Sequence, residues 1–138
     1  MQYTGCKAGT FLLYRHKFVT IGGTVMLTKD ELPVCPVATT VSLIGNKWKL
    51  LILRNLLAGT CRFGELRKGI PGISQKVLTD NLREMESDGL LNRTVFAEVP
   101  PRVEYSLSDL GNSMRPIIKD MEAWGKKYRE MVLNDQTQ

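Results

Sequence analysis

The sequence contains few of the residues that metal sites and disulfide-stabilised folds require. It has one histidine, His16, and an odd, widely spaced set of three cysteines, Cys6, Cys35 and Cys61. This set forms neither a recognisable metal-ligand cluster nor a disulfide framework, and such cysteine usage is typical of a reducing compartment. We therefore expect a cytoplasmic protein that binds no metal.

Signals for membrane insertion, secretion and catalysis are also missing. No apolar run approaches the ~18 residues of a membrane span. The first basic residues follow an apolar patch, whereas in a secretory signal they would precede it. No Gly-rich phosphate loop, catalytic triad or pair of carboxylates is visible, and a thiol enzyme would lack an activating base outside the N-terminal segment. We expect a protein without enzymatic activity, cofactor or membrane association.

The size and charge of the chain permit one folded domain with short appendages. Its 138 residues are 43% hydrophobic and 24% charged, with a formal net charge of +5. The excess of positive charge suits a polyanionic partner, although Lys7, Arg15 and Lys17 all lie in the first 25 residues. We predict a domain over residues 35–133, a poorly ordered tail over 1–34 and a disordered end over 134–138. A basic arm that touches the DNA backbone is the alternative for the tail.

Two helices are predicted to begin the folded part. Pro36 suits the first position of a helix because its missing N–H would be unpaired there. Gly45 and Asn46 end this helix, and a second helix follows over Lys47–Ala58 (KWKLLILRNLLA). The second helix is apolar on so many sides that we expect it at the centre of a small fold.

A short helix over Arg62–Lys68 and a longer one over Gln75–Asp88 are predicted next, joined by a turn that contains glycine and proline. Ser74 is the expected N-cap of the longer helix. Four apolar residues at helical spacing form the inward stripe of that helix: Val77, Leu78, Leu82 and Met85.

Two extended runs, Leu90–Val99 and Arg102–Leu107, are predicted to form a β-hairpin with Pro100 and Pro101 at its tip. In the second run apolar and polar residues alternate with a period of two, which is typical of a half-buried strand. The hairpin therefore has one face available for the core and one for solvent.

A long helix over Asp109–Leu133, with Ser108 as N-cap and a kink at Pro116, is predicted to end the domain. Its apolar residues recur at steps of four and three, the spacing of a helix that packs along another helix. These residues are Leu110, Met114, Ile117, Met121, Trp124, Tyr128 and Met131.

The order of the elements is that of a winged helix-turn-helix, a mainly α fold with a small β-hairpin and here a long C-terminal helix. An α-helix fits the major groove of DNA, where the bases are distinguishable, and Gln and Arg read base edges with paired hydrogen bonds. We therefore expect Arg83 to read bases. The full set of residues expected to contact DNA is Ser74, Gln75, Lys76, Thr79 and Arg83 on the longer helix, Arg62, Arg67 and Lys68 on the short helix, and Arg102 on the hairpin.

Plainer alternatives exist for these assignments. A polar helix face is often only solvated, and Asp80 has Lys76 or Arg83 as a possible ion-pair partner. Arg102 has glutamates close by in the sequence and is either paired with one of them or available to a phosphate. A winged-helix module that binds another protein, without a DNA target, is the alternative function.

The chain resembles the HxlR-type family of bacterial regulators, a branch of the MarR-like winged-helix proteins. The matching stretches are CPV at Cys35–Val37, IGNKWKLLILRNLL at Ile44–Leu57, the segment Arg62–Gly111 and the WGKKY sequence at Trp124. The resemblance covers nearly everything except the tail.

This resemblance implies a homodimeric DNA-binding regulator whose first and last helices pair the subunits. The two recognition helices would then bind pseudo-palindromic half-sites about one helical turn apart in double-stranded DNA. The residues expected in the dimer interface are Val37, Val41 and Ile44 on the first helix and Met114, Ile117, Met121, Trp124 and Tyr128 on the last.

Several relatives in the family sense oxidants or electrophiles through a cysteine just before the first helix, and Cys35 occupies that place. The helix dipole independently favours the thiolate there, which raises reactivity. An inert, half-buried cysteine is the alternative. Cys61 departs from the family, which usually has a larger residue at that position. It is either a partner for Cys35 across the dimer or a loop thiol without a role.

Overall fold

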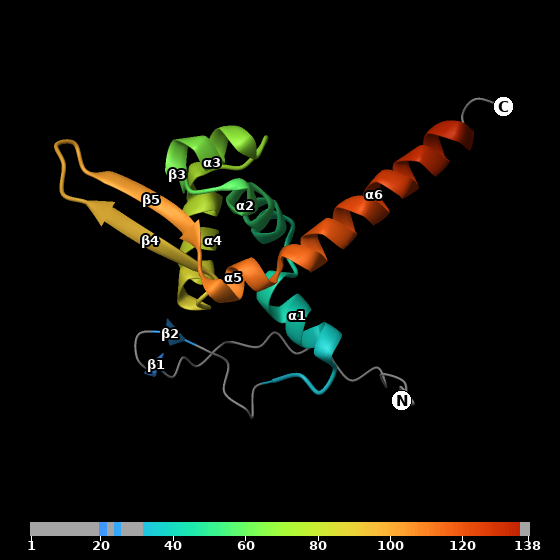
Figure 1. Cartoon of the computed structure of the whole chain (residues 1–138), viewed down its shortest axis with the longest axis horizontal. Helices are drawn as coiled ribbons and strands as arrows, with labels where there is room; N and C mark the ends of the chain where they lie inside the picture. The colour runs from blue at the N-terminus through green and yellow to red at the C-terminus, as the bar shows by residue number, and fades with distance from the viewer. Residues whose placement is uncertain (1–19, 22–23, 26–31, 136–138) are drawn as a thin grey trace.

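The computed structural model describes residues 20–21, 24–25 and 32–135 of the chain (Figure 1). Most of the tail predicted for residues 1–34 lies outside these residues; the described part of it comprises two short strands that pair with each other and residues 32–34. The elements in chain order are β1 (Thr20–Ile21), β2 (Thr24–Val25), α1 (Pro36–Ile44), α2 (Lys47–Ala58), β3 (Cys61–Arg62), α3 (Phe63–Gly69), α4 (Gln75–Ser87), β4 (Leu91–Phe96), β5 (Arg102–Leu107), α5 (Asp109–Ser113) and α6 (Arg115–Asp135).

The predicted central position of α2 is confirmed. Ile52 and Leu53 are fully buried, and α3, α4 and the sheet pack around the helix. The Asn46 side chain caps α2 by accepting a hydrogen bond from the Lys49 N–H at 2.9 Å. The buried apolar residues that α3 and α4 add to this core are Leu66, Leu78, Leu82 and Met85. Removing these side chains from water is the main driving force for folding of the domain.

The helix-turn-helix is formed by α3 and α4. Ser74 caps α4 as predicted, because its hydroxyl accepts a hydrogen bond from the Val77 N–H at 3.2 Å. In the turn between the helices Gly72 has a φ of +83°, a backbone conformation that residues other than glycine adopt only with strain. The cap and this glycine together fix the direction in which α4 leaves the turn.

The wing has three strands, whereas the sequence predicted two. The order is β3–β5–β4, all antiparallel, and the added strand places Cys61 opposite Tyr105. Arg62 therefore begins no helix; it ends β3, and its N–H donates to the Glu65 carboxylate at 2.6 Å. The first predicted strand, Leu90–Val99, is shorter in the structure, where β4 ends at Phe96. The segment 97–101 connects β4 to β5, and its prolines have no N–H to donate to a neighbouring strand.

The predicted long C-terminal helix is confirmed, but the kink expected at Pro116 is a complete break. The structure has two helices that are separated at Met114. Pro116 explains the break, because it has no N–H to donate to the Asn112 carbonyl and its ring would collide with that carbonyl. In the first turn of a new helix, α6, the same proline is well tolerated. α6 continues to Asp135, which is two residues past the predicted end.

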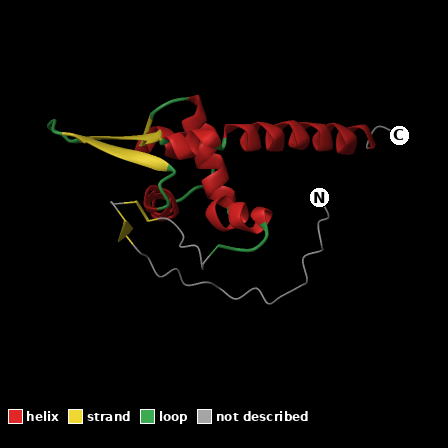
Figure 2. Ribbon diagram, turned by 60° about the horizontal axis from the view of Figure 1, so that its bottom comes forward, coloured by secondary structure: helices red, strands yellow, loops and turns green. Residues whose placement is uncertain are grey.

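α6 projects from the body of the domain, away from the wing (Figures 1 and 2). Ile118 is its only buried residue, and it packs into the core near the start of the helix. Helices that stay stable in water generally need an apolar face covered by a neighbour. Across the described residues no helix is both long and apolar enough to cross a membrane.

Candidate nucleic-acid interface

The N-terminal half of α4 presents polar side chains to solvent. Ser74, Gln75 and Lys76 are exposed, and Thr79 is half-buried with its hydroxyl donating to the Gln75 carbonyl at 2.8 Å. Of the two ion-pair partners considered for Asp80, the structure selects Lys76, with a distance of 2.6 Å between Nζ and Oδ2. An exposed pair of this kind contributes little, about 0–1 kcal/mol, so Lys76 can exchange Asp80 for another anion at small cost.

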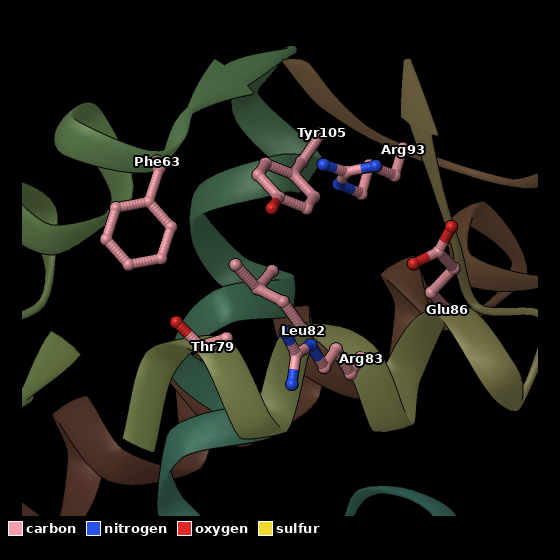
Figure 3. A pocket seen from close by; sticks show the side chains of 7 residues that line it. All are labelled: Phe63, Thr79, Leu82, Arg83, Glu86, Arg93 and Tyr105. Atoms are coloured by element: carbon pink, nitrogen blue, oxygen red, sulfur yellow. The ribbon is translucent and has the colours of Figure 1, made fainter. Parts of the chain in front are cut away.

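The C-terminal half of α4 borders a cleft against the wing (Figure 3). Arg83 lies on this border, so the residue predicted to read bases faces a hollow of the protein's own surface. The cleft has a volume of about 370 Å³ and is lined by Phe63, Thr79, Leu82, Arg83, Glu86, Arg93 and Tyr105.

No sequence pattern singled out Arg93. It lies opposite Tyr105 in the β4–β5 ladder, so both side chains stand on the same face of the sheet. Leu91 and Val95 occupy the neighbouring positions of that face on β4. An arginine between two apolar residues at a period of two was the available signal, because such a position points toward the core side of a strand.

Arg102 does not stand free on the wing. Its guanidinium pairs with Glu98 at 3.1 Å and with Glu104 at 3.0 Å, and it lies over the ring of Phe96 at 4.0 Å. These contacts match the alternative of pairing with a neighbouring glutamate. A phosphate contact by Arg102 stays a prediction, and it would have to displace one of the two carboxylates.

The three basic residues predicted on the short helix are exposed. Arg62 precedes α3, and Arg67 and Lys68 lie in its last turn. In the segment from residue 32 to 135 none of the three takes part in an ion pair. They are therefore available for backbone phosphates, but nothing in their geometry selects one of them.

A polar network that no sequence pattern predicted holds α4 against α2. Lys49 is buried, and its Nζ lies 3.0 Å from a Glu84 oxygen and 3.7 Å from an Asp88 oxygen. The same ammonium donates to the Leu43 carbonyl at the end of α1 at 3.3 Å. Lys49 thereby ties α1, α2 and α4 together at one point.

A second link of this network joins two asparagines. The Asn46 amide donates to Asn81 at 3.0 Å, and the buried Asn81 donates in turn to the Val77 carbonyl at 2.8 Å. Hydrogen bonds between buried groups fix orientation more strictly than apolar contacts do, because they fail when a helix rotates. We therefore expect the network to restrain the angle of α4, together with the buried apolar residues of that helix.

The residues predicted for the dimer interface divide into two groups. Ile44 is buried in the chain's own core and Met114 is half-buried against it, so this subunit already covers both. Trp124 is 67% exposed and stacks on Tyr128 with ring centroids 5.4 Å apart. The predicted interface residues that remain exposed are Val37 and Val41 on α1 and Ile117, Met121, Trp124 and Tyr128 on α6.

The cysteines lie in different environments. Cys35 is the N-cap of α1, half-buried, with its carbonyl accepting from the Thr39 N–H at 3.0 Å. Burial raises the pKa of the Cys61 thiol, and the nearby carboxylate of Glu65 raises it further. Cys6 lies outside the described residues. Among the residues that the structure describes, no group of ligands for a metal ion is present.

Comparisons with known proteins agree with this arrangement. The HxlR-like helix-turn-helix family model matches residues 43–132. The HTH-type transcriptional regulator YdeP of Bacillus subtilis strain 168 is 46% identical over 105 residues, which are 76% of this chain and 82% of YdeP.

Solved structures show the same fold. The redox regulator HypR in its oxidised form superposes with a TM-score of 0.65 at 44% identity, over 67% of this chain and 96% of that one. Diamide-treated YodB from B. subtilis gives 0.58 at 35% identity, over 69% of this chain and 95% of that one.

Proposed function

This chain belongs to the HxlR-like helix-turn-helix family of transcriptional regulators, and from that premise we propose that it is a cytoplasmic homodimer that binds a pseudo-palindromic operator in double-stranded DNA. Each subunit would insert α4 into the major groove. Half-sites about 34 Å apart, one turn of B-DNA, would bring both recognition helices to the same face of the duplex.

One observation carries this proposal. The inner side of α4 is anchored by buried Leu78, Leu82 and Met85, while Gln75 and Lys76 on its outer side remain exposed. A helix held rigidly on one face and polar on the other can enter a groove without reorganising. The exposed apolar residues on α1 and α6 support the dimer, because a monomer would leave them in water.

Replacing Gln75 by alanine tests the base-reading role. We expect binding to the specific operator to weaken by about 1–3 kcal/mol, with little change on random DNA, because the glutamine amide would pair with a base edge. Fluorescence anisotropy with a labelled promoter fragment and a scrambled one measures both affinities.

Lys76→Ala is the matched control on the next residue. We expect it to weaken binding to both DNAs by similar factors, since a phosphate contact carries no sequence information. If Gln75→Ala affects both fragments as evenly as Lys76→Ala does, α4 does not read bases through Gln75.

Oxidant sensing is the second part of the proposal. HypR is described as a redox regulator, and YodB has been solved after diamide treatment. Cys35 stands at the N-terminus of α1, next to the exposed Val37 of the proposed interface. Diamide removes two electrons and two protons from two thiols, leaving a disulfide and the reduced hydrazine. An intersubunit disulfide between the Cys35 thiols of the two subunits would change the packing of α1 and with it the spacing of the two recognition helices.

Replacing Cys35 by serine should leave DNA binding intact and abolish its response to diamide. In the wild-type protein we expect diamide to change operator affinity by roughly five- to a hundredfold, the usual range of coupling between two sites. Cys61→Ser serves as the control and should respond as the wild type does, since the raised pKa of Cys61 leaves less thiolate to react. A wild-type response that survives in Cys35→Ser would refute sensing at this residue.

A further inference from the structure

The cleft between α4 and the wing has basic residues on both of its walls. Arg93 and Tyr105 extend from the sheet on one side, while Thr79, Leu82, Arg83 and Glu86 line the other side along α4 (Figure 3). Phe63 closes one end. The site is thus assembled from segments far apart in the sequence, and it is open to solvent.

The charges around this cleft favour an anion. Arg83 and Arg93 carry two positive charges against the single negative charge of Glu86. Neither guanidinium forms an ion pair within residues 32–135, whereas Lys76 and Arg102 are both paired. A guanidinium presents donors in a fixed fork that matches the oxygens of a phosphate.

The Tyr105 hydroxyl is a neutral hydrogen-bond donor in the cleft beside the two guanidinium groups. The oxygen of Tyr105 points into the cleft (Figure 3) and has no hydrogen-bond partner among the residues that the structure describes. Because the Tyr105 residue is only 8% exposed, its ring is fixed by the core and its hydroxyl is held in place before any ligand arrives. Such preorganisation reduces the entropy lost on binding.

The position of the cleft along α4 favours the DNA backbone as the source of the anion. Gln75, Thr79 and Arg83 follow one another at intervals of four residues and so lie on one stripe of the helix. With a rise of 1.5 Å per residue, Arg83 is about 12 Å from Gln75 along the axis, more than the ~8.5 Å depth of the major groove. With the N-terminal end of α4 at the bases, as in the proposed function, Arg83 would lie outside the groove floor, near the DNA backbone.

We propose that this cleft binds one phosphate of the DNA backbone, with Arg83 and Arg93 as its charged ligands and Tyr105 as a neutral donor. The proposal rests on the proposed function, and it moves Arg83 from base reading to phosphate binding. Arg93 thereby becomes a DNA contact that lies on a strand of the wing and not at its tip.

Arg93→Ala tests the proposal directly. Affinity should fall by about tenfold on the operator and on random DNA alike, and Arg83→Ala should behave in the same way. The dependence of log affinity on log salt should become shallower by about 0.9 for each phosphate that the variant no longer neutralises, hence by that amount for each subunit. A weaker affinity for the operator alone would mean that these arginines read bases, and it would overturn the proposal.

Glu86→Gln is expected to raise the DNA affinity, whereas the two arginine variants lower it. An increase in affinity cannot be attributed to misfolding. Removing a carboxylate next to the phosphate should strengthen binding to both DNAs by about two- to threefold. Arg54→Ala is the matched control for the two arginine variants and should leave DNA affinity nearly unchanged. Arg54 is exposed on α2 on the side of Glu122 of α6, away from the cleft. If Glu86→Gln leaves affinity unchanged, no anion binds beside it.

Competition with inorganic phosphate distinguishes a site for a DNA phosphate from a site for a free anion. We expect millimolar phosphate to weaken DNA binding of the wild type more than chloride does at equal ionic strength, and this excess to vanish in Arg93→Ala. If phosphate raises the melting temperature of the wild type through Arg93 while Arg93→Ala binds DNA normally, the cleft is a site for a free anion and the proposal is wrong. A wild-type protein that binds no DNA would refute the proposed function itself.

Discussion

Replacing Met121 and Trp124 together by glutamate is expected to convert the proposed dimer into monomers. Both side chains are exposed on α6, and Trp124 stacks on Tyr128. Large aromatic side chains at the centre of an interface commonly contribute about 2 kcal/mol or more, and buried charge adds a further penalty. We expect a loss of about 4 kcal/mol, roughly a thousandfold in the dimer Kd.

The loss of the dimer should also remove most of the operator affinity, because one subunit contacts only one half-site. Light scattering coupled to gel filtration measures the mass, and anisotropy measures DNA binding. The double variant Lys119→Gln with Ala123→Glu changes the charge by the same amount on the opposite side of α6 and should remain dimeric. A dimer that persists in Met121→Glu with Trp124→Glu would place the interface elsewhere.

The second large effect is expected at Lys49. Replacing Glu84 by glutamine and Asp88 by asparagine together leaves the ammonium of Lys49 buried without a carboxylate. Breaking a buried pair from one side costs about 3–5 kcal/mol. Glu84 is itself well exposed, so we expect the low end, about 3 kcal/mol of the free energy of unfolding.

Lys49→Met is the informative comparison, because it removes the buried charge and keeps a flexible side chain of similar length. We expect it to cost only about 1 kcal/mol, less than the double carboxylate variant, since both carboxylates can then be hydrated. Urea denaturation measures both changes. If Lys49→Met is the more destabilising of the two, losing the contacts of the ammonium costs more than leaving it without a carboxylate, and the expected penalty for the unpaired charge is wrong.

Lys49→Met should also affect DNA recognition. The Lys49 network links α1, α2 and α4, so its loss removes an angular restraint on the recognition helix. We expect the Lys49→Met protein to remain folded yet discriminate less well between the operator and random DNA.

Patterns within short segments predicted much of this protein. The bounds of α1 and α2 were obtained from the helical spacing of their apolar residues and from Gly45 and Asn46 between them. The Ser74 cap was also predicted correctly, and Lys76 was one of the two ion-pair partners considered for Asp80, because each interaction connects residues no more than four positions apart. Interactions of this range are encoded in the local sequence.

Features that join distant segments could not be predicted in this way. The Cys61–Arg62 strand is too short to show a period of two, and it exists because β5 offers it an edge. Ile44 lies on the same helical stripe as Val37 and Val41, yet only the packing of α1 against the body decided that Ile44 would be buried and the other two exposed.

The sequence by itself determined the order of the elements, the helix-turn-helix and the polar face of α4, because periodicity and capping act between neighbours. Only the tertiary structure decided that Arg93 meets Arg83 across a cleft and that Lys49 meets Glu84 and Asp88. Strand register and helix packing bring these residues together from separate segments, and no local pattern in the chain contains that information.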